Sequence, residues 1–159
     1  MTDDDSLEKL TGHPFDKRRF LKIARIRRSY LNEHPADDDL SMEPLATLGD
    51  SVLRAVVTYR LWREAVRDQK KLTEGYLSQR RDELVKRENT KAFAKNNHLE
   101  DLILWGGGER KDKIWDKGTA TYDMVTEALI GAVFLDAQNN DLNGIKIVGD
   151  MLDRMDFFN

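Results

Sequence analysis

The 159-residue sequence contains no cysteine, and it has only three histidines and three prolines. Without cysteine the chain can form neither a disulfide nor a thiolate metal site, which is typical of an intracellular protein. The histidines, His13, His34 and His98, are widely separated and show no metal-ligand spacing. We therefore assign none of them to a metal ion.

A long apolar run is also missing, because none approaches the about 20 residues that a membrane-spanning helix needs. The first six residues are acidic and polar, unlike a secretory signal peptide, and we expect residues 1–6 to form a flexible tail. With 40% apolar and 35% charged residues, the composition is that of a globular protein. These features predict one domain over residues 1–159, located in the cytoplasm or an organelle lumen, without membrane contact.

The net charge of −3 provides no overall attraction to nucleic acid, so any RNA contact has to come from local basic patches. The sequence contains two clusters of basic residues. The first consists of Lys17, Arg18, Arg19, Lys22, Arg25, Arg27 and Arg28, and the second of Arg80, Arg81, Lys86, Arg87, Lys91 and Lys95. Each cluster is either an ordinary solvated helix face or an RNA-facing surface, and the pattern leaves both readings open.

Helical spacing of apolar residues dominates the chain, and strand-like alternation is rare. We predict helices at residues 20–26, 44 to about 68, about 78–95, about 121–137 and about 142–155, after a short segment with Leu7, Leu10 and Phe15. Residues 34–39 should form a loop, Asn96 and Asn97 should end the third long helix, and Gly106–Gly108 should form a mobile connector. The fold class is therefore all-α, with several packed amphipathic helices.

Two of the predicted helices carry an acidic residue inside an otherwise apolar pattern. These residues are Asp50 in the helix at 44–68 and Glu127 in the helix at 121–137. A buried carboxylate costs several kcal/mol unless it is paired or binds a cation. Asp50 is therefore either a satisfied structural acid or part of a functional site, and Glu127 either forms a salt bridge or joins that site.

Five blocks of sequence carry a resemblance to a known family. They are Leu10–Phe15, Arg28–Glu33, Met42–Leu53, Thr73–Ser78 with Leu84 and Val85, and Thr126–Asp136. Together and in this order they resemble the endonuclease domain of the ribonuclease III family, and Met42–Leu53 resembles its signature motif. The resemblance covers nearly the whole chain and implies an all-helical domain that dimerises. It also implies that the signature helix packs closely against its dimer mate at Gly49, with Leu48, Val52 and Phe134 as interface or core residues.

The resemblance further implies four acidic metal ligands, two on the signature helix four residues apart and two on the later helix three apart. Asp50 and Glu127 match the second acid of each pair. The two other positions are Ala46 and Met124, which offer no magnesium ligand. Half of the expected set is therefore missing from its usual place.

Three other acids are candidate substitutes. Asp123 lies four residues before Glu127 on the same helical face, although it could instead cap the helix start. Glu43 and Glu74 match additional acidic positions of the family. These residues predict a catalytic set of Asp50, Glu127, Asp123, Glu43 and Glu74, with Asp50, Glu127 and Asp123 as ligands of one Mg²⁺ and with Mn²⁺ as a possible substitute. Two well-ordered ions would be harder to hold.

The resemblance implies a homodimeric, divalent-metal-dependent endoribonuclease that cuts double-stranded or structured RNA to 5′-phosphate and 3′-hydroxyl ends. We expect no double-stranded RNA-binding domain of the kind that many relatives append, and therefore weak or partner-assisted binding or a restriction to structured precursors. Ala46 leaves an alternative open: a degenerate member that binds structured RNA, or assists ribonucleoprotein assembly, without cutting. Ala46 could also belong to a rearranged active site or be an engineered change, and a helical protein unrelated to RNA is a third reading.

Overall fold

The computed structural model describes all 159 residues. It contains nine α-helices and two short 3-10 helices, joined by loops, and no β-strand. The all-α prediction is therefore confirmed. The helices are α1 (Asp3–Thr11), α2 (Arg18–Arg25), α3 (Arg28–Glu33), α4 (Glu43–Arg67), α5 (Glu74–Leu84), α6 (Arg87–Asn96), η1 (Leu99–Leu102), α7 (Gly107–Lys111), η2 (Ile114–Asp116), α8 (Ala120–Asn139) and α9 (Gly144–Arg154). No helix is both long enough and apolar enough to span a lipid bilayer.

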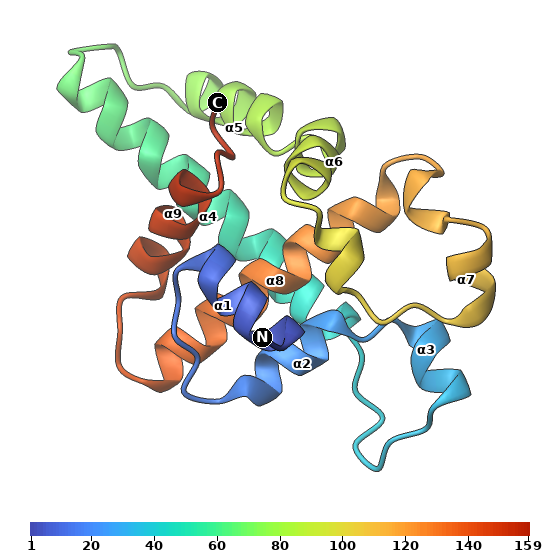
Figure 1. The fold of residues 1–159 in the computed structure, drawn as a ribbon. Coiled ribbons are helices and arrows are strands. Elements are labelled where there is room, and N and C mark those ends of the chain that lie inside the picture. Colours follow the sequence, from blue (N-terminus) through green and yellow to red (C-terminus); the bar gives the residue numbers. More distant parts are fainter.

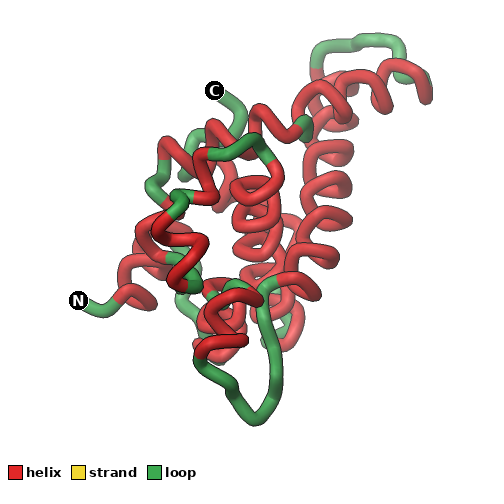
Figure 2. Tube along the Cα trace, turned by 90° about the vertical axis from the view of Figure 1, so that its right-hand side faces the viewer, coloured by secondary structure: helices red, strands yellow, loops and turns green.

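Helices α4 and α8 cross at the centre of the molecule, and α2, α6 and α9 pack around α8 (Figures 1 and 2). Two glycines allow the crossing. A Cβ atom on Gly49 would lie 1.7 Å from the Glu127 carbonyl oxygen, and one on Gly131 would lie 2.1 Å from that of Leu45. The close approach at Gly49 is thus made by α8 of the same chain, and not by the dimer mate that the resemblance implied. Val52 lies in the core, while Leu48 and Phe134 pack against it half-buried.

The predicted helix at residues 44–68 is confirmed as α4, and the two last predicted helices as α8 and α9. The single helix expected at about 78–95 is wrong, because α5 ends at Leu84 and α6 begins at Arg87. Lys86 lies between them with φ −60° and ψ 150°, an extended conformation that no helix interior adopts. The chain therefore bends there, where a long amphipathic pattern gave no break signal.

Residues 3–6 form the start of α1, with Thr2 as its N-cap, and not the expected flexible tail. Thr2 accepts a hydrogen bond from the Asp5 backbone N–H, and the Asp5 carboxylate accepts one from the Thr2 N–H, which closes a capping box. Asp3 and Asp4 also pair with the largely buried Arg25, at 2.6 and 2.9 Å. Capping and ion pairs together fix the N-terminus to α2.

The glycine triplet does not form the expected mobile connector, because Gly106 is buried and Gly107 and Gly108 begin α7. A Cβ on Gly106 would lie 2.6 Å from the Cβ of Ser29, so α3 and this segment are in close contact. The Gly107 N–H donates to the Glu33 carboxylate at 2.8 Å, and Gly107 begins α7. The triplet thus docks a short helix against α3.

A buried pair connects the N-terminal segment to the end of α8. His13 and Asp136 are almost fully buried, and His13 Nε2 lies 2.8 Å from Asp136 Oδ2. The Asp136 carboxylate also accepts the backbone N–H groups of Asp16 and Lys17. His13 is therefore engaged in the protein interior.

Candidate functional site

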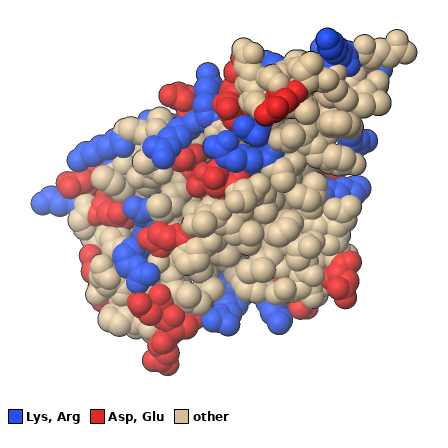
Figure 3. Space-filling model, turned by 180° about the vertical axis from the view of Figure 1, so that it is seen from behind, with Lys and Arg blue, Asp and Glu red and all other residues tan.

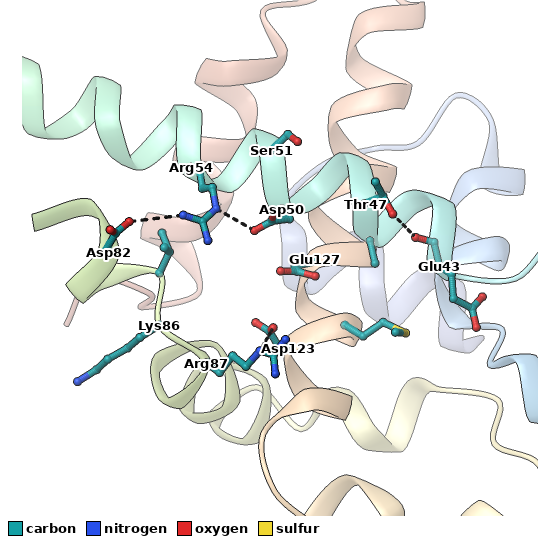
Figure 4. A pocket seen from close by; sticks show the side chains of 13 residues that line it. Glu43, Thr47, Asp50, Ser51, Arg54, Asp82, Lys86, Arg87, Asp123 and Glu127 are labelled. Carbon is teal, nitrogen blue, oxygen red and sulfur yellow. Dashed lines mark hydrogen bonds and ion pairs between the residues drawn. The ribbon is translucent and has the colours of Figure 1, made fainter. Parts of the chain in front are cut away.

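A pocket of about 680 Å³ opens between α4, the start of α6 and the first half of α8. It is lined by Glu43, Ala46, Thr47, Asp50, Ser51, Arg54, Asp82, Val85, Lys86, Arg87, Asp123, Met124 and Glu127. Figure 4 shows the carboxyl groups of Asp50, Glu127 and Asp123 facing the same open space. The structure therefore brings together three of the five predicted site residues.

Asp50 reaches the pocket from the middle of α4, directly after Gly49. Its Oδ1 accepts a hydrogen bond from Arg54 Nε at 3.2 Å, one helical turn further along. Arg54 Nη1 lies 3.5 Å from Oδ1 of Asp82, so Arg54 also connects α4 to α5. Asp50 Oδ2 has no basic partner.

Glu127 lies opposite Asp50 because the close α4–α8 crossing brings its backbone next to Gly49. Burial raises the pKa of the Glu127 carboxyl to about 8, and the nearby charges of Asp123 and Asp50 and a hydrogen bond with Asp50 add to the rise. The positive charge of Arg87 offsets part of it. Burial, with the neighbouring carboxylates, thus favours the protonated form of Glu127 at neutral pH.

Asp123 is held on both oxygens. Thr90 Oγ1 donates to its Oδ1 at 2.7 Å, and Arg87 Nε lies 3.1 Å from its Oδ2. Asp123 does not cap α8, because Thr119 occupies the N-cap position and Asp123 lies one turn inside. These contacts connect the first turn of α8 to α6.

The remaining predicted acids lie further away. Glu43 lines the edge of the pocket, but its carboxylate accepts a hydrogen bond from Ser41 and points away from Asp50 (Figure 4). Glu74 is the exposed first residue of α5 and does not line the pocket. Within this single chain, Glu74 is therefore not part of the acidic group.

Ala46 and Met124 both lie in the pocket wall, at the positions where oxygen ligands were expected. The Met124 sulfur accepts a hydrogen bond from Arg27 Nη1 at 3.2 Å, and Arg27 pairs with Glu109 at 2.8 Å. A thioether and a methyl group are poor partners for a hard cation such as Mg²⁺. The two departures therefore remove ligands from the pocket itself.

The carboxyl groups of Asp50 and Glu127, which remain after the two departures, fit one hydrated divalent ion. No three acidic or histidine side chains lie close enough to enclose a metal ion together, so the expectation of three joint ligands, Asp50, Glu127 and Asp123, is not met. Magnesium, however, is often bound through one or two carboxylates and keeps several waters. Asp50 and Glu127 could supply this pair, and a cation would offset the repulsion that Asp123 and Asp50 add to the effect of burial on Glu127.

The sequence reasoning missed the contacts of two arginines in this pocket. Arg54 was assigned no role, although its position four residues after Asp50 is the spacing of a helical ion pair. Arg87 was placed in a basic cluster, but its pairing with Asp123 depends on the bend between α5 and α6. A pattern that predicts one continuous helix cannot place this side chain in the pocket.

Comparison with known proteins shows which family the chain resembles in sequence and structure. The model of the ribonuclease III domain matches residues 43–138. The chain is 37% identical to ribonuclease 3 of Shewanella denitrificans over 82% of this chain and 53% of that protein. It is 33% identical to ribonuclease 3 of Leifsonia xyli over 99% of this chain and 64% of that protein. The chain thus spans about half to two thirds of the length of these relatives.

Solved structures agree with this placement. The crystal structure of the nuclease domain of ribonuclease III from Campylobacter jejuni has a TM-score of 0.77 and 25% identity, covering 98% of this chain and 94% of that one. A second structure of that domain, with a TM-score of 0.77, is described for structural flexibility in a region involved in dimer formation. From the family match and the shared fold, the chain belongs to the ribonuclease III family.

Proposed function

We propose that the chain is a divalent-metal-dependent endoribonuclease that cuts double-stranded or structured RNA and leaves 5′-phosphate and 3′-hydroxyl ends. The observation that carries the proposal is the meeting of the Asp50 and Glu127 carboxyls, from two crossing helices, in one pocket. Ribonuclease III enzymes generally depend on divalent metals, which fits this acidic pair.

Asp50 and Glu127 would hold one Mg²⁺, with Mn²⁺ as a substitute. When bound, the ion supplies Lewis-acid polarisation of the phosphate and a water of lowered pKa. Because the pKa of Glu127 is about 8 in the metal-free protein, its carboxyl has to release a proton as the ion binds. Asp123 positions Arg87 and α6, since both its oxygens are already engaged.

The RNA would lie along the basic side chains of α5 and α6, next to the pocket. Exposed residues there include Arg80, Lys86, Arg87 and Lys95. Basic side chains that contact phosphates give salt-dependent binding, and duplex RNA is recognised mainly by shape and backbone. Little sequence preference is therefore expected from this domain.

The chain would act as a homodimer, so that each pocket cuts one strand. Half of the side-chain surface of Tyr59, Trp62 and Val66 on α4 is exposed, at 54%, 50% and 58%. Figure 3 shows a broad face with almost no charged side chains, bordered by acidic and basic groups. An exposed apolar helix face is a candidate protein interface, and dimer formation is described for the Campylobacter jejuni nuclease domain.

The second candidate function is RNA binding without cleavage. Ala46 and Met124 favour it, because each removes an oxygen ligand from the pocket wall. Arg54 and Arg87 favour it as well, since they already neutralise Asp50 and Asp123. The two functions differ in whether a product forms.

The test is a gel assay with labelled duplex RNA in Mg²⁺, Mn²⁺ or EDTA. The proposal expects metal-dependent cleavage that Asp50→Asn reduces by at least about 100-fold, because the variant removes a charged ligand. Asp153→Asn is the matched control, since Asp153 is an exposed acid on α9 that pairs with Arg60. Ala46→Glu should increase the rate by restoring a ligand. Salt-sensitive binding without product in either metal supports the second candidate and contradicts the first.

A further inference from the structure

The pocket contains two arginines whose side chains enter the same space from opposite walls. Arg54 extends from α4 and Arg87 from the first residue of α6 (Figure 4). Each is fixed through its Nε, Arg54 by Asp50 at 3.2 Å and Arg87 by Asp123 at 3.1 Å. Their orientation is therefore set by the same carboxyls that form the acidic group.

Both guanidinium groups keep unused donors. Arg54 contacts Asp82 through Nη1 only, so its Nη2 is free, and neither Nη of Arg87 bonds to the protein. The side chains of Arg54 and Arg87 are 45% and 65% exposed. A planar guanidinium held at one end, with free N–H groups at the other, is well suited to bind a phosphate oxygen.

The balance of charge in the pocket limits the number of cations that it can hold. Figure 4 shows Glu43 and Lys86 pointing away from the centre of the pocket. Their opposite charges cancel in the count of the pocket's net charge. The remaining four acids and two arginines leave an excess of two negative charges when Glu127 is ionised. One divalent cation neutralises this excess. A second ion would find neither an excess of charge nor oxygen ligands, since Ala46 and Met124 occupy those positions.

We propose that Arg54 and Arg87 jointly bind a phosphate group of the RNA backbone in this pocket and so take the place of a second divalent cation. The inference rests on the proposed function for the identity of the ligand as RNA, but not on cleavage. Lys86 and Arg87 are the N-cap and first residue of α6, so the positive end of this ten-residue helix lies at the same wall and adds to the attraction.

Metal-free binding is the first test. Labelled duplex RNA is titrated with the whole chain in EDTA, over a range of salt concentrations, for the parent, Arg54→Ala, Arg87→Ala and Arg67→Ala. Arg67 is an exposed arginine at the far end of α4 that pairs with Asp68, and it serves as the control. We expect about tenfold weaker binding for each pocket variant and a salt slope lower by about 1. Arg54→Lys and Arg87→Lys should restore the slope but only part of the affinity, because lysine lacks the planar fork.

The number of ions is the second test. Mn²⁺ titration followed by electron paramagnetic resonance should give one bound ion per chain for the parent. Two ions per chain, or pocket variants that bind RNA with the affinity and salt slope of Arg67→Ala, would overturn the inference. Cleavage by a parent whose arginine variants bind normally leaves the proposed function intact. Arginine-dependent binding without cleavage supports this inference and contradicts the proposed endoribonuclease activity.

Discussion

At the scale of single residues, the pocket contains three neighbouring carboxyl groups but only two arginines that pair with them. Asp123 has Arg87 and Thr90, and Asp50 has Arg54, but Glu127 has no ion-pair partner of its own. Burial, followed by the repulsion from Asp123 and Asp50, therefore raises the pKa of Glu127 and keeps its proton in the metal-free protein. Because this proton is present in the folded chain and absent from the unfolded one, Glu127 makes stability depend on pH.

We predict that the metal-free protein loses stability as pH rises from about 5 to 8. The pKa of Glu127 rises from 4.5 to about 8 on folding, so between these values the folded chain holds a proton that the unfolded chain has released. This contribution is complete below pH 4.5 and lost above pH 8. Thermal unfolding in EDTA at several pH values measures it. Glu127→Gln should flatten the decline, and Mg²⁺ should raise the parent's melting temperature most at pH 8. An equal pH dependence in Glu127→Gln would contradict this account.

At the scale of helices, the site is built by one close crossing. Gly49 and Gly131 let α4 and α8 approach until each glycine faces a carbonyl oxygen of the other helix. Glycine inside a helix costs about 1 kcal/mol relative to alanine. Here the glycine also brings Glu127 opposite Asp50, so the same contact stabilises the core and assembles the acidic group.

We predict that Gly49→Ala lowers the free energy of unfolding by about 3 kcal/mol or more, because its Cβ would lie 1.7 Å from backbone oxygen, which cannot move aside. Gly108→Ala is the control, since nothing lies within 4 Å of a Cβ there. It should be neutral or stabilise α7 by about 0.4–1 kcal/mol. Urea unfolding measures both. A Gly49→Ala protein with the parent's urea midpoint would show that the helices can separate at no cost.

The helices could be predicted from the sequence where a strong local pattern agrees with the packing. Asp50 and Glu127 stood out because an acid within an apolar helix needs a partner, and α4 and α8 were found from the same periodicity. The bend at Lys86 could not be predicted, because it follows from the packing of α6 against α8, not from a local breaker. As a result Arg87 and Thr90, which hold Asp123, were not associated with the site.

At the scale of the whole molecule, the exposed face of α4 connects the pocket to the proposed dimer. Thr47, Ser51 and Ala55 continue the stripe of Tyr59, Trp62 and Val66 at helical spacing, and all six are exposed. Thr47 and Ser51 also line the pocket. A second copy packed on this stripe would therefore border the pocket, and two pockets would lie near each other. Sequence periodicity could not separate this face from the core, because both are apolar.

We predict that Trp62→Glu converts a dimer into a monomer, because it introduces a charge at an exposed apolar position that the partner would bury. Leu142→Glu is the matched control, since Leu142 is equally exposed, at 48%, but lies between α8 and α9. Sedimentation velocity over a range of concentrations measures the mass of each. The monomer should keep its helical circular dichroism and lose paired-strand cleavage of duplex RNA. A Trp62→Glu protein that sediments as the parent does, or a Leu142→Glu protein that dissociates instead, would place the interface elsewhere.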